Sequence, residues 1–167
     1  MGVEVERKFL VDSARWKPEG DGVLYRQGYL SSAKECVARV RVAGDEAYLT
    51  VKGVSIGLSR LEFEYAIPRE DAEVLLQRLC VPPLVEKTRR RQVVDGKLWE
   101  IDVFHGDNEG LILAEIELES EDQAVKLPCW VREEVSDDPR YLNANLARFP
   151  YKRWSGVEAG PKRPAAK

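Results

Sequence analysis

The sequence predicts a mainly β fold of the α+β class, in which strands form most of the domain and three helices are added. Two observations support this prediction. Apolar and charged residues alternate with a period of two over much of the chain, which is the pattern of strands with two different faces. Turn signals separate these runs, and Asp95-Gly96 between two of them is a strong hairpin signal.

Eight segments show the alternation and are expected to be strands. They are residues 3–11, 24–30, 36–42, 47–52, 58–67, 86–94, 97–104 and 111–119. The spacing of apolar and charged residues within each segment predicts that one face of the strand is apolar and the other is charged.

Three further segments are expected to be helices. Residues 68–80 have leucines at helical spacing behind a proline and two acidic residues. A short helix is expected after Ser120, because Ser120 and Gln123 can form a capping box. A third helix is expected to begin at Asp138-Pro139, with an apolar side formed by Leu142, Leu146 and Phe149.

Length and composition suit one domain, expected over residues 1–154, with residues 155–167 forming a mobile tail rich in Gly, Pro, Lys and Ala. The net charge of −3 argues against a general surface for duplex nucleic acid. No apolar run resembles a signal peptide or a membrane span, so we expect a cytoplasmic protein with no membrane partner. The sequence leaves a homodimer open.

Three cysteines, Cys36, Cys80 and Cys129, show no metal-binding spacing. An odd number of cysteines without such spacing is typical of reduced, buried thiols in a cytosolic protein.

The charged residues of the strand-like segments recur at intervals of two, and their sign changes from segment to segment. The first segment carries Glu4, Glu6 and Lys8 on one face. Later pairs are basic at Arg39/Arg41 and Lys87/Arg89, and acidic at Glu62/Glu64, Glu100/Asp102 and Glu115/Glu117. Any one pair is typical of a strand with a solvated face. The whole series is better explained by a shared ionic surface.

If the strands close into a barrel, this ionic surface becomes the inside. The helices need apolar surface to cover, so the face with Phe63, Ile101 and Ile116 is expected to lie outside. An empty, dry interior lined with charged side chains is energetically unfavourable, whereas a wet interior that holds an ionic ligand is reasonable. A polyphosphate with Mg²⁺ or Mn²⁺ suits both signs, because phosphate oxygens pair with Lys and Arg and the metal bridges carboxylates to phosphate.

Glu4-Val5-Glu6-Arg7-Lys8 resembles the ExExK signature of the CYTH superfamily, the triphosphate tunnel metalloenzymes. The resemblance extends in order over roughly residues 3–149. It continues through Gln27-Gly28-Tyr29-Leu30, Arg39-Val40-Arg41, Thr50-Val51-Lys52, Arg60-Leu61-Glu62-Phe63-Glu64, Lys87-Thr88-Arg89, Trp99-Glu100-Ile101-Asp102 and Ala114-Glu115-Ile116-Glu117. It implies a closed eight-stranded antiparallel β-barrel tunnel, with helices packed outside, that binds triphosphates with a divalent metal.

Within this resemblance, hypotheses for individual residues follow. The expected substrate-binding set is Lys8, Arg39, Arg41, Lys52, Lys87 and Arg89. The expected metal-binding set is Glu4, Glu6, Glu62, Glu64, Asp102, Glu115 and Glu117, with the alternative that some of these acids are counter-ions of the arginines. Lys8 and Arg41 are also expected to act in catalysis. The resemblance suggests that Tyr29 orients or deprotonates the attacking water, and a buried aromatic residue with a satisfied hydroxyl is the alternative.

The leading functional hypothesis is the metal-dependent hydrolysis of inorganic tripolyphosphate to pyrophosphate and orthophosphate. Alternatives are adenylate cyclase on the same scaffold, and a thiamine or nucleoside triphosphatase. A non-catalytic polyphosphate-binding module is less favoured, because binding alone would require the basic residues more than the acidic pairs.

Overall fold

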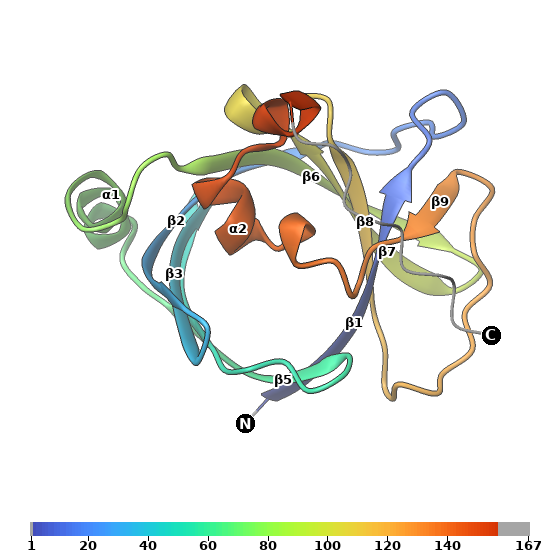
Figure 1. Cartoon of the computed structure of the whole chain (residues 1–167), viewed down its shortest axis with the longest axis horizontal. Helices are drawn as coiled ribbons and strands as arrows, with labels where there is room; N and C mark the ends of the chain where they lie inside the picture. The colour runs from blue at the N-terminus through green and yellow to red at the C-terminus, as the bar shows by residue number, and fades with distance from the viewer. Residues whose placement is uncertain (1, 157–167) are drawn as a thin grey trace.

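All eight expected strands are present, and they close into an antiparallel barrel (Figure 1). The computed structural model describes residues 2–156. The barrel strands are β1 (Gly2–Val11), β2 (Val23–Ala33), β3 (Cys36–Ala43), β4 (Glu46–Lys52), β5 (Ser59–Ala66), β6 (Val85–Val94), β7 (Lys97–Phe104) and β8 (Ile112–Glu117). Their order is β5-β4-β3-β2-β6-β7-β8-β1, and pairing of β5 with β1 closes the ring.

The register places the charged positions of neighbouring strands opposite one another. Glu6 pairs with Glu117 and Lys8 with Glu115 across β1 and β8. The β6–β7 hairpin turns at Asp95 and Gly96, with φ of 49° and 74°, as expected for an Asp-Gly turn. Because alternate side chains point to opposite faces, this register collects the charged residues inside the barrel.

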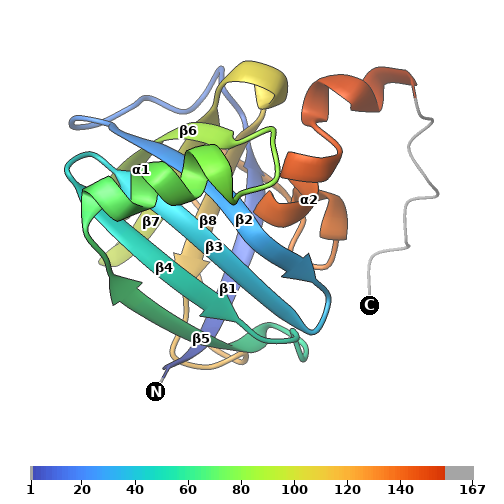
Figure 2. The same ribbon diagram turned by 90° about the vertical axis from the view of Figure 1, so that its left-hand side faces the viewer.

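The outer face is apolar, as the sequence predicts. Ile101 and Ile116 are buried there with Trp99 and Trp130, beneath the chain that follows β8. On the other side, helix α1 (Arg69–Arg78) packs across β2, β3 and β4 and buries Ala72 and Leu76 (Figure 2). The outer surface is therefore covered by helix and loop, which leaves the inner face for the ionic residues.

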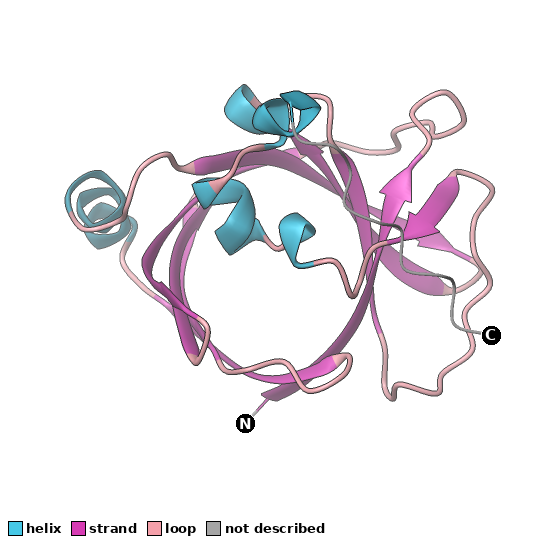
Figure 3. Cartoon of the chain, in the orientation of Figure 1, coloured by secondary structure: helices cyan, strands magenta, loops and turns pink. Residues whose placement is uncertain are grey.

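The C-terminal segment lines the barrel instead of packing outside it. Helix α2 (Asn143–Arg148) lies within the ring of strands in the view down the barrel, whereas α1 lies outside it (Figure 3). Leu146 and Ala147 of α2 are buried with Tyr29, Phe104 and Leu113 of the barrel wall. The interior thus has an apolar end next to α2 and an ionic middle.

Two expectations for the helices are wrong. Residues 120–130 contain no helix. The Glu119 amide donates to Gln123 Oε1 at 2.7 Å, which forms a turn, and the chain continues as a loop to β9. The expected helix from Asp138 is broken at Leu142, whose ψ of 133° is extended. It becomes a 3₁₀ turn, η2 (Pro139–Tyr141), followed by α2.

Several smaller features complete the fold. A ninth strand, β9 (Val131–Glu134), was not expected and pairs with the end of β1. Short 3₁₀ turns lie at η1 (Gly106–Asn108) and η3 (Tyr151–Gly156). Of the three cysteines, all free, only Cys80 is buried, so the expectation of buried thiols is wrong for Cys36 and Cys129. The expected mobile tail lies outside the described residues, except for its first two, which end η3.

Among the residues that the structure describes, no helix has both the length and the apolar character needed to cross a membrane.

Leu146→Ala should destabilise the protein by about 2–5 kcal/mol, because it opens a cavity in the apolar end of the barrel. Leu146 is fully buried there. Urea unfolding followed by circular dichroism measures the change. Val74→Ala on the exposed side of α1 serves as the control and should shift stability by less than about 0.5 kcal/mol. Equal effects of the two substitutions would contradict the packing of α2 in the barrel.

Candidate active site

A cavity of about 260 Å³ occupies the inside of the barrel. All of the predicted site residues except Asp102 line it, and its wall carries both signs of charge. Its lining includes Glu4, Glu6, Lys8, Tyr29, Arg39, Arg41, Lys52, Glu62, Glu64, Lys87, Arg89, Glu115 and Glu117, together with Glu100 of the acidic pair on β7. Arg60, Arg91 and the Leu142–Ala144 segment also line it, and sequence reasoning did not select them as site residues.

Asp102 is not a wall residue of the cavity but a buried counter-ion. Its Oδ2 accepts from Lys87 Nζ at 2.8 Å, and its Oδ1 accepts from Arg89 Nε at 2.7 Å. Burial would raise the pKa of Asp102, but the charges of Arg89 and Lys87 outweigh it and hold that pKa below the usual value. This geometry favours the counter-ion alternative for Asp102 over the predicted role as a metal ligand.

Lys87 is enclosed between the barrel wall and α2. Its Nζ also donates to Asn143 Oδ1 at 3.4 Å, at the first residue of α2. Burial lowers the pKa of Lys87 to about 8, although Asp102 opposes the shift. Lys87 is therefore charged at neutral pH, and it loses its charge when the pH rises above about 8.

Glu115 connects β8 to the basic residues of two other strands. It lies 3.4 Å from Lys8 Nζ and 3.6 Å from Arg89 Nη2. Although burial disfavours its charge, Lys8 and Arg89 hold the pKa of Glu115 well below its usual value. Glu115 is therefore a carboxylate that already has cationic partners.

Arg39 and Arg41 on β3 retain unused hydrogen-bond donors. Both guanidiniums approach Glu64 Oε2, at 3.7 and 3.3 Å, so Glu64 serves as their counter-ion. The buried Nε atoms of Arg39 and Arg41 have no hydrogen-bond partner among the described residues. Because a buried, unpaired donor is unfavourable, these two guanidiniums have donor capacity that an acceptor-rich ligand could use.

A second ionic group is formed where β1, β4 and β5 meet. Lys52 Nζ lies 3.1 Å from Glu62 and 3.5 Å from Glu4. Arg60 donates from Nε to Glu4 at 3.3 Å and from Nη2 to Glu6 at 3.1 Å. Sequence reasoning missed Arg60, although it lies two residues before Glu62 and four before Glu64, so the same alternation could have placed it inside.

The acidic residues of this group fit a hard divalent cation by the type of their donor atoms. Burial raises the pKa of Glu4 and Glu6, and the neighbouring carboxyls of Glu62 and Glu115 raise them further. A bound cation would relieve this repulsion. Within residues 2–156, however, no three acidic, histidine or cysteine side chains are gathered closely enough to form a complete ligand set. Water and substrate oxygens would have to supply the remaining ligands.

Tyr29 lies at the boundary between the cavity and the apolar end. Its hydroxyl accepts a hydrogen bond from Gln27 Nε2 at 3.1 Å. Burial raises the pKa of Tyr29, although the charge of Arg39 opposes the shift. A raised pKa disfavours the phenolate, so this shift favours a protonated hydroxyl that orients a ligand over one that removes a proton from water.

The family model of the CYTH domain matches residues 2–148. The chain belongs to this family. An inorganic triphosphatase of Acetivibrio thermocellus is 51% identical to this CYTH domain over 154 residues, which cover 92% of this chain and 99% of that protein. An inorganic triphosphatase of Nitrosomonas europaea is 42% identical over 150 residues, which cover 86% and 96%.

A solved crystal structure of an inorganic triphosphatase has the same architecture. It superposes on this CYTH domain with a TM-score of 0.63 at 39% identity, covering 88% of this chain and 95% of that chain. The expected fold, the closed eight-stranded antiparallel barrel, is confirmed.

Asp102→Asn should destabilise this CYTH domain by about 3–5 kcal/mol, because it leaves the buried charges of Lys87 and Arg89 without their carboxylate. The free energy of unfolding in urea measures the effect. Asp107→Asn, at an exposed position of η1, is the matched control and should change stability by less than about 0.5 kcal/mol. A stable Asp102→Asn variant would show that Asp102 is not the counter-ion that the buried pair requires.

The depressed pKa of Lys87 predicts a pH-dependent contribution to stability. Between pH 8 and the usual lysine value of 10.5, the unfolded chain holds a proton that folded Lys87 has lost. Stability due to this group therefore rises with pH across that window. Urea unfolding at pH 7.5, 9 and 10 should show wild type gaining stability relative to Lys87→Met. A constant difference between the two proteins would mean that Lys87 has an ordinary pKa.

Proposed function

We propose that this CYTH domain hydrolyses inorganic tripolyphosphate to pyrophosphate and orthophosphate with the help of a divalent cation. The observation that carries the proposal is the cavity inside the closed barrel, lined by cations from β1, β3, β4 and β6, with unpaired Nε donors on Arg39 and Arg41. The inorganic triphosphatases at 51% and 42% identity support the choice of substrate.

The proposed substrate-binding residues surround the cavity. Arginine forks bind phosphate oxygens in pairs and lysines act as point charges. The proposed set is Lys8, Arg39, Arg41, Lys52, Lys87 and Arg89, each of which lines the cavity. All six of these cations have a carboxylate partner in the structure, so a triphosphate must offer them stronger contacts than the carboxylates do.

The proposed metal ligands are carboxylates on the cavity wall, namely Glu4, Glu6, Glu62, Glu64, Glu115 and Glu117. Glu4, Glu6, Glu64 and Glu115 all pair with basic residues, so the metal would have to compete with those cations for carboxylate oxygens. The cation, proposed to be Mg²⁺ or Mn²⁺, would neutralise phosphate charge in the transition state.

The chain's own residues are proposed to orient the reaction. Lys8 and Arg41 would hold the phosphate oxygens on which charge develops as water attacks the terminal phosphorus. The protonated hydroxyl of Tyr29, which Gln27 holds, would orient the water or a phosphate oxygen. The apolar end beside α2 would exclude bulk water from this side of the reaction.

We also propose a cytoplasmic location, since all three cysteines are free thiols.

Removal of charge at Glu6, Lys8, Arg41 or Glu117 should lower metal-dependent phosphate release by at least about 100-fold, because each change removes an interaction with the charge of the transition state. The variants Glu6→Gln, Lys8→Met, Arg41→Met and Glu117→Gln are assayed on tripolyphosphate with Mg²⁺ and with Mn²⁺. Circular dichroism should show folded proteins. Retained activity in any two of the four would overturn the proposed site.

The choice of substrate is tested in the same assay with tripolyphosphate, thiamine triphosphate, ATP and GTP. Orthophosphate released fastest from tripolyphosphate is the expected result. Cyclic AMP together with pyrophosphate from ATP would instead identify a cyclase. Tight binding of tripolyphosphate without turnover, under either metal, would identify a binding module.

A further inference from the structure

The barrel wall has a seam where β1 changes partner. Residues Gly2 to Val5 of β1 pair with β5, whereas Phe9 and Val11 pair with β9. Between these segments β1 is paired with β8 along its other edge, and the seam edge carries hydrogen bonds to both flanking chains. The Glu6 amide donates to Leu58 O at 3.4 Å, the Lys8 amide donates to Ser136 Oγ at 2.9 Å, and the Val135 amide donates to Lys8 O at 2.8 Å. The two flanking chains therefore diverge beside Glu6 and Lys8.

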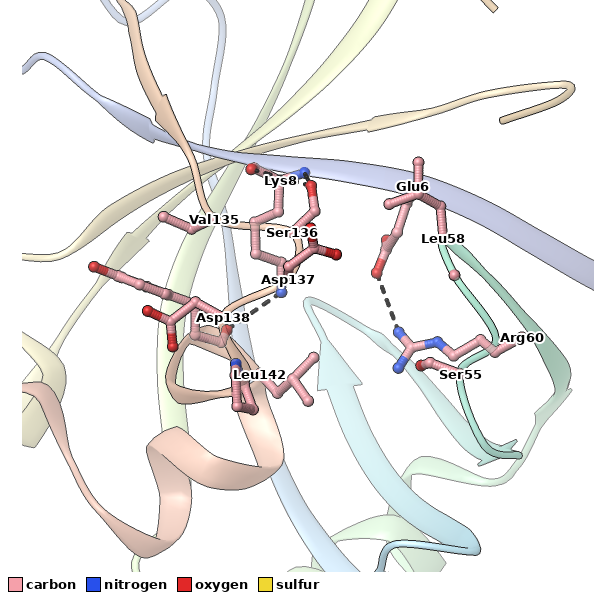
Figure 4. Close-up of a pocket in the computed structure, with 13 residues that line it drawn as sticks. Glu6, Lys8, Ser55, Leu58, Arg60, Val135, Ser136, Asp137, Asp138 and Leu142 are labelled. Carbon is pink, nitrogen blue, oxygen red and sulfur yellow. Dashed lines mark hydrogen bonds and ion pairs between the residues drawn. The ribbon is translucent and has the colours of Figure 1, made fainter. Parts of the chain in front are cut away.

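A second cavity of about 240 Å³ lies at this seam. It shares Glu6, Lys8, Arg60 and Leu142 with the main cavity, so the two spaces adjoin. Figure 4 shows Arg60 and Ser55 on one side of this side cavity and Asp137 with Ser136 on the other. It therefore offers room and oxygen acceptors on the far side of Arg60.

Arg60 bridges two of the carboxylates that are proposed to bind the metal, Glu4 and Glu6. Its guanidinium donates to Glu4 with one nitrogen and to Glu6 with another, at 3.3 and 3.1 Å. Its side chain is only 17% exposed, so these contacts are little screened by water. The guanidinium thus occupies the same carboxylate oxygens that a cation would need.

We propose that Arg60 is a resident counter-cation that stands in for the divalent metal, holding Glu4 and Glu6 in the metal-free protein and moving toward the side cavity when the metal binds. This inference rests on the proposed function, because it takes Glu4 and Glu6 as metal ligands. In this proposal Arg60 has a positioning role, and the side cavity receives its guanidinium when the metal binds.

The geometry of the charges supports an exchange of one cation for the other. The carboxylates of Glu4, Glu6 and Glu62, set against Arg60 and Lys52, leave one net negative charge, and Glu117, which faces Glu6 from β8, adds a second. A divalent cation added beside Arg60 would bring two cations onto the same oxygens of Glu4 and Glu6, which repel at such short range. A divalent cation in place of Arg60 avoids this repulsion.

The side cavity makes the exchange structurally feasible. A buried guanidinium that loses its carboxylates needs new acceptors, because an unpaired buried charge is strongly unfavourable. Asp137 is exposed on the wall of the side cavity, and Ser55 and Ser136 add hydroxyl oxygens. Arg60 lines both cavities, so the proposed movement is one of its side chain between two adjoining spaces.

Mn²⁺ titration of the metal-free protein by calorimetry, without substrate, tests the proposal. Arg60→Met removes the competing cation and should bind Mn²⁺ about fivefold more tightly or better, a ratio within the usual range of coupling between sites. Arg60→Lys keeps the charge and should stay near the wild-type affinity. Without metal, Arg60→Met should melt at a lower temperature than wild type, and saturating Mn²⁺ should recover most of the difference.

Arg91→Met is the matched control. Arg91 lines the same main cavity, but its carboxylate partner is Glu100, so its loss removes an equal charge without freeing Glu4 or Glu6. Its Mn²⁺ affinity should stay within about twofold of wild type, below the usual coupling range. An unchanged or weaker affinity in Arg60→Met, or an equal gain in Arg91→Met, would overturn the proposal.

A second measurement does not depend on whether Arg60→Met folds. In NMR spectra of wild type, the Nε–H resonance of Arg60 is assigned by its absence from Arg60→Lys. At saturating Mg²⁺ this resonance should shift, and its proton should exchange faster with water. A resonance that stays unchanged would overturn the proposal. Tripolyphosphate hydrolysis by the same wild-type preparation is assayed separately, so an inactive protein would count against the proposed function, whereas the metal titration and the resonance judge Arg60.

Discussion

The pairing of β5 with β1 is the constraint on which the rest of the structure depends. Once the sheet closes, one face of every strand is inside, and here that face is ionic. Charges of one sign could not be enclosed in so small a space, so the strands together must supply both signs. The group of Asp102, Lys87 and Arg89 is the tightest instance, with contacts of 2.7 and 2.8 Å and no solvent exposure for the carboxylate.

The interior is divided along the barrel axis, and this division links the fold to the chemistry. The end next to α2 is apolar, whereas the middle has cations and carboxylates within reach of one cavity. Pairing between the cations and carboxylates of the wall favours the folded, metal-free barrel. The same pairing means that ligands must compete with these partners for the charged groups. The unpaired Nε atoms of Arg39 and Arg41 are the places where that competition is least.

The sequence predicts the strands and the direction of their charged side chains well, because a period of two has one structural meaning when it recurs in eight segments. It predicts less about the partner of each charge. Asp102 and Glu100 look alike in sequence, yet the register of β6 and β7 buries the first behind Lys87 and leaves the second at the cavity wall. The break at Leu142 was also hidden, because the leucine spacing suits a continuous helix and packing against the barrel interior decides otherwise.

Strand β1 contacts β5, β8 and β9, and two of these partners lie near the opposite end of the chain. The earliest of these barrel strands in the chain is therefore among the last to be fully paired. Contacts between such distant segments slow folding, since a long loop must close before they form. During translation the ionic face of β1 would stay open to solvent until β8 emerges from the ribosome. Its alternating charges suit that delay, because they keep an unpaired strand edge soluble and resistant to aggregation.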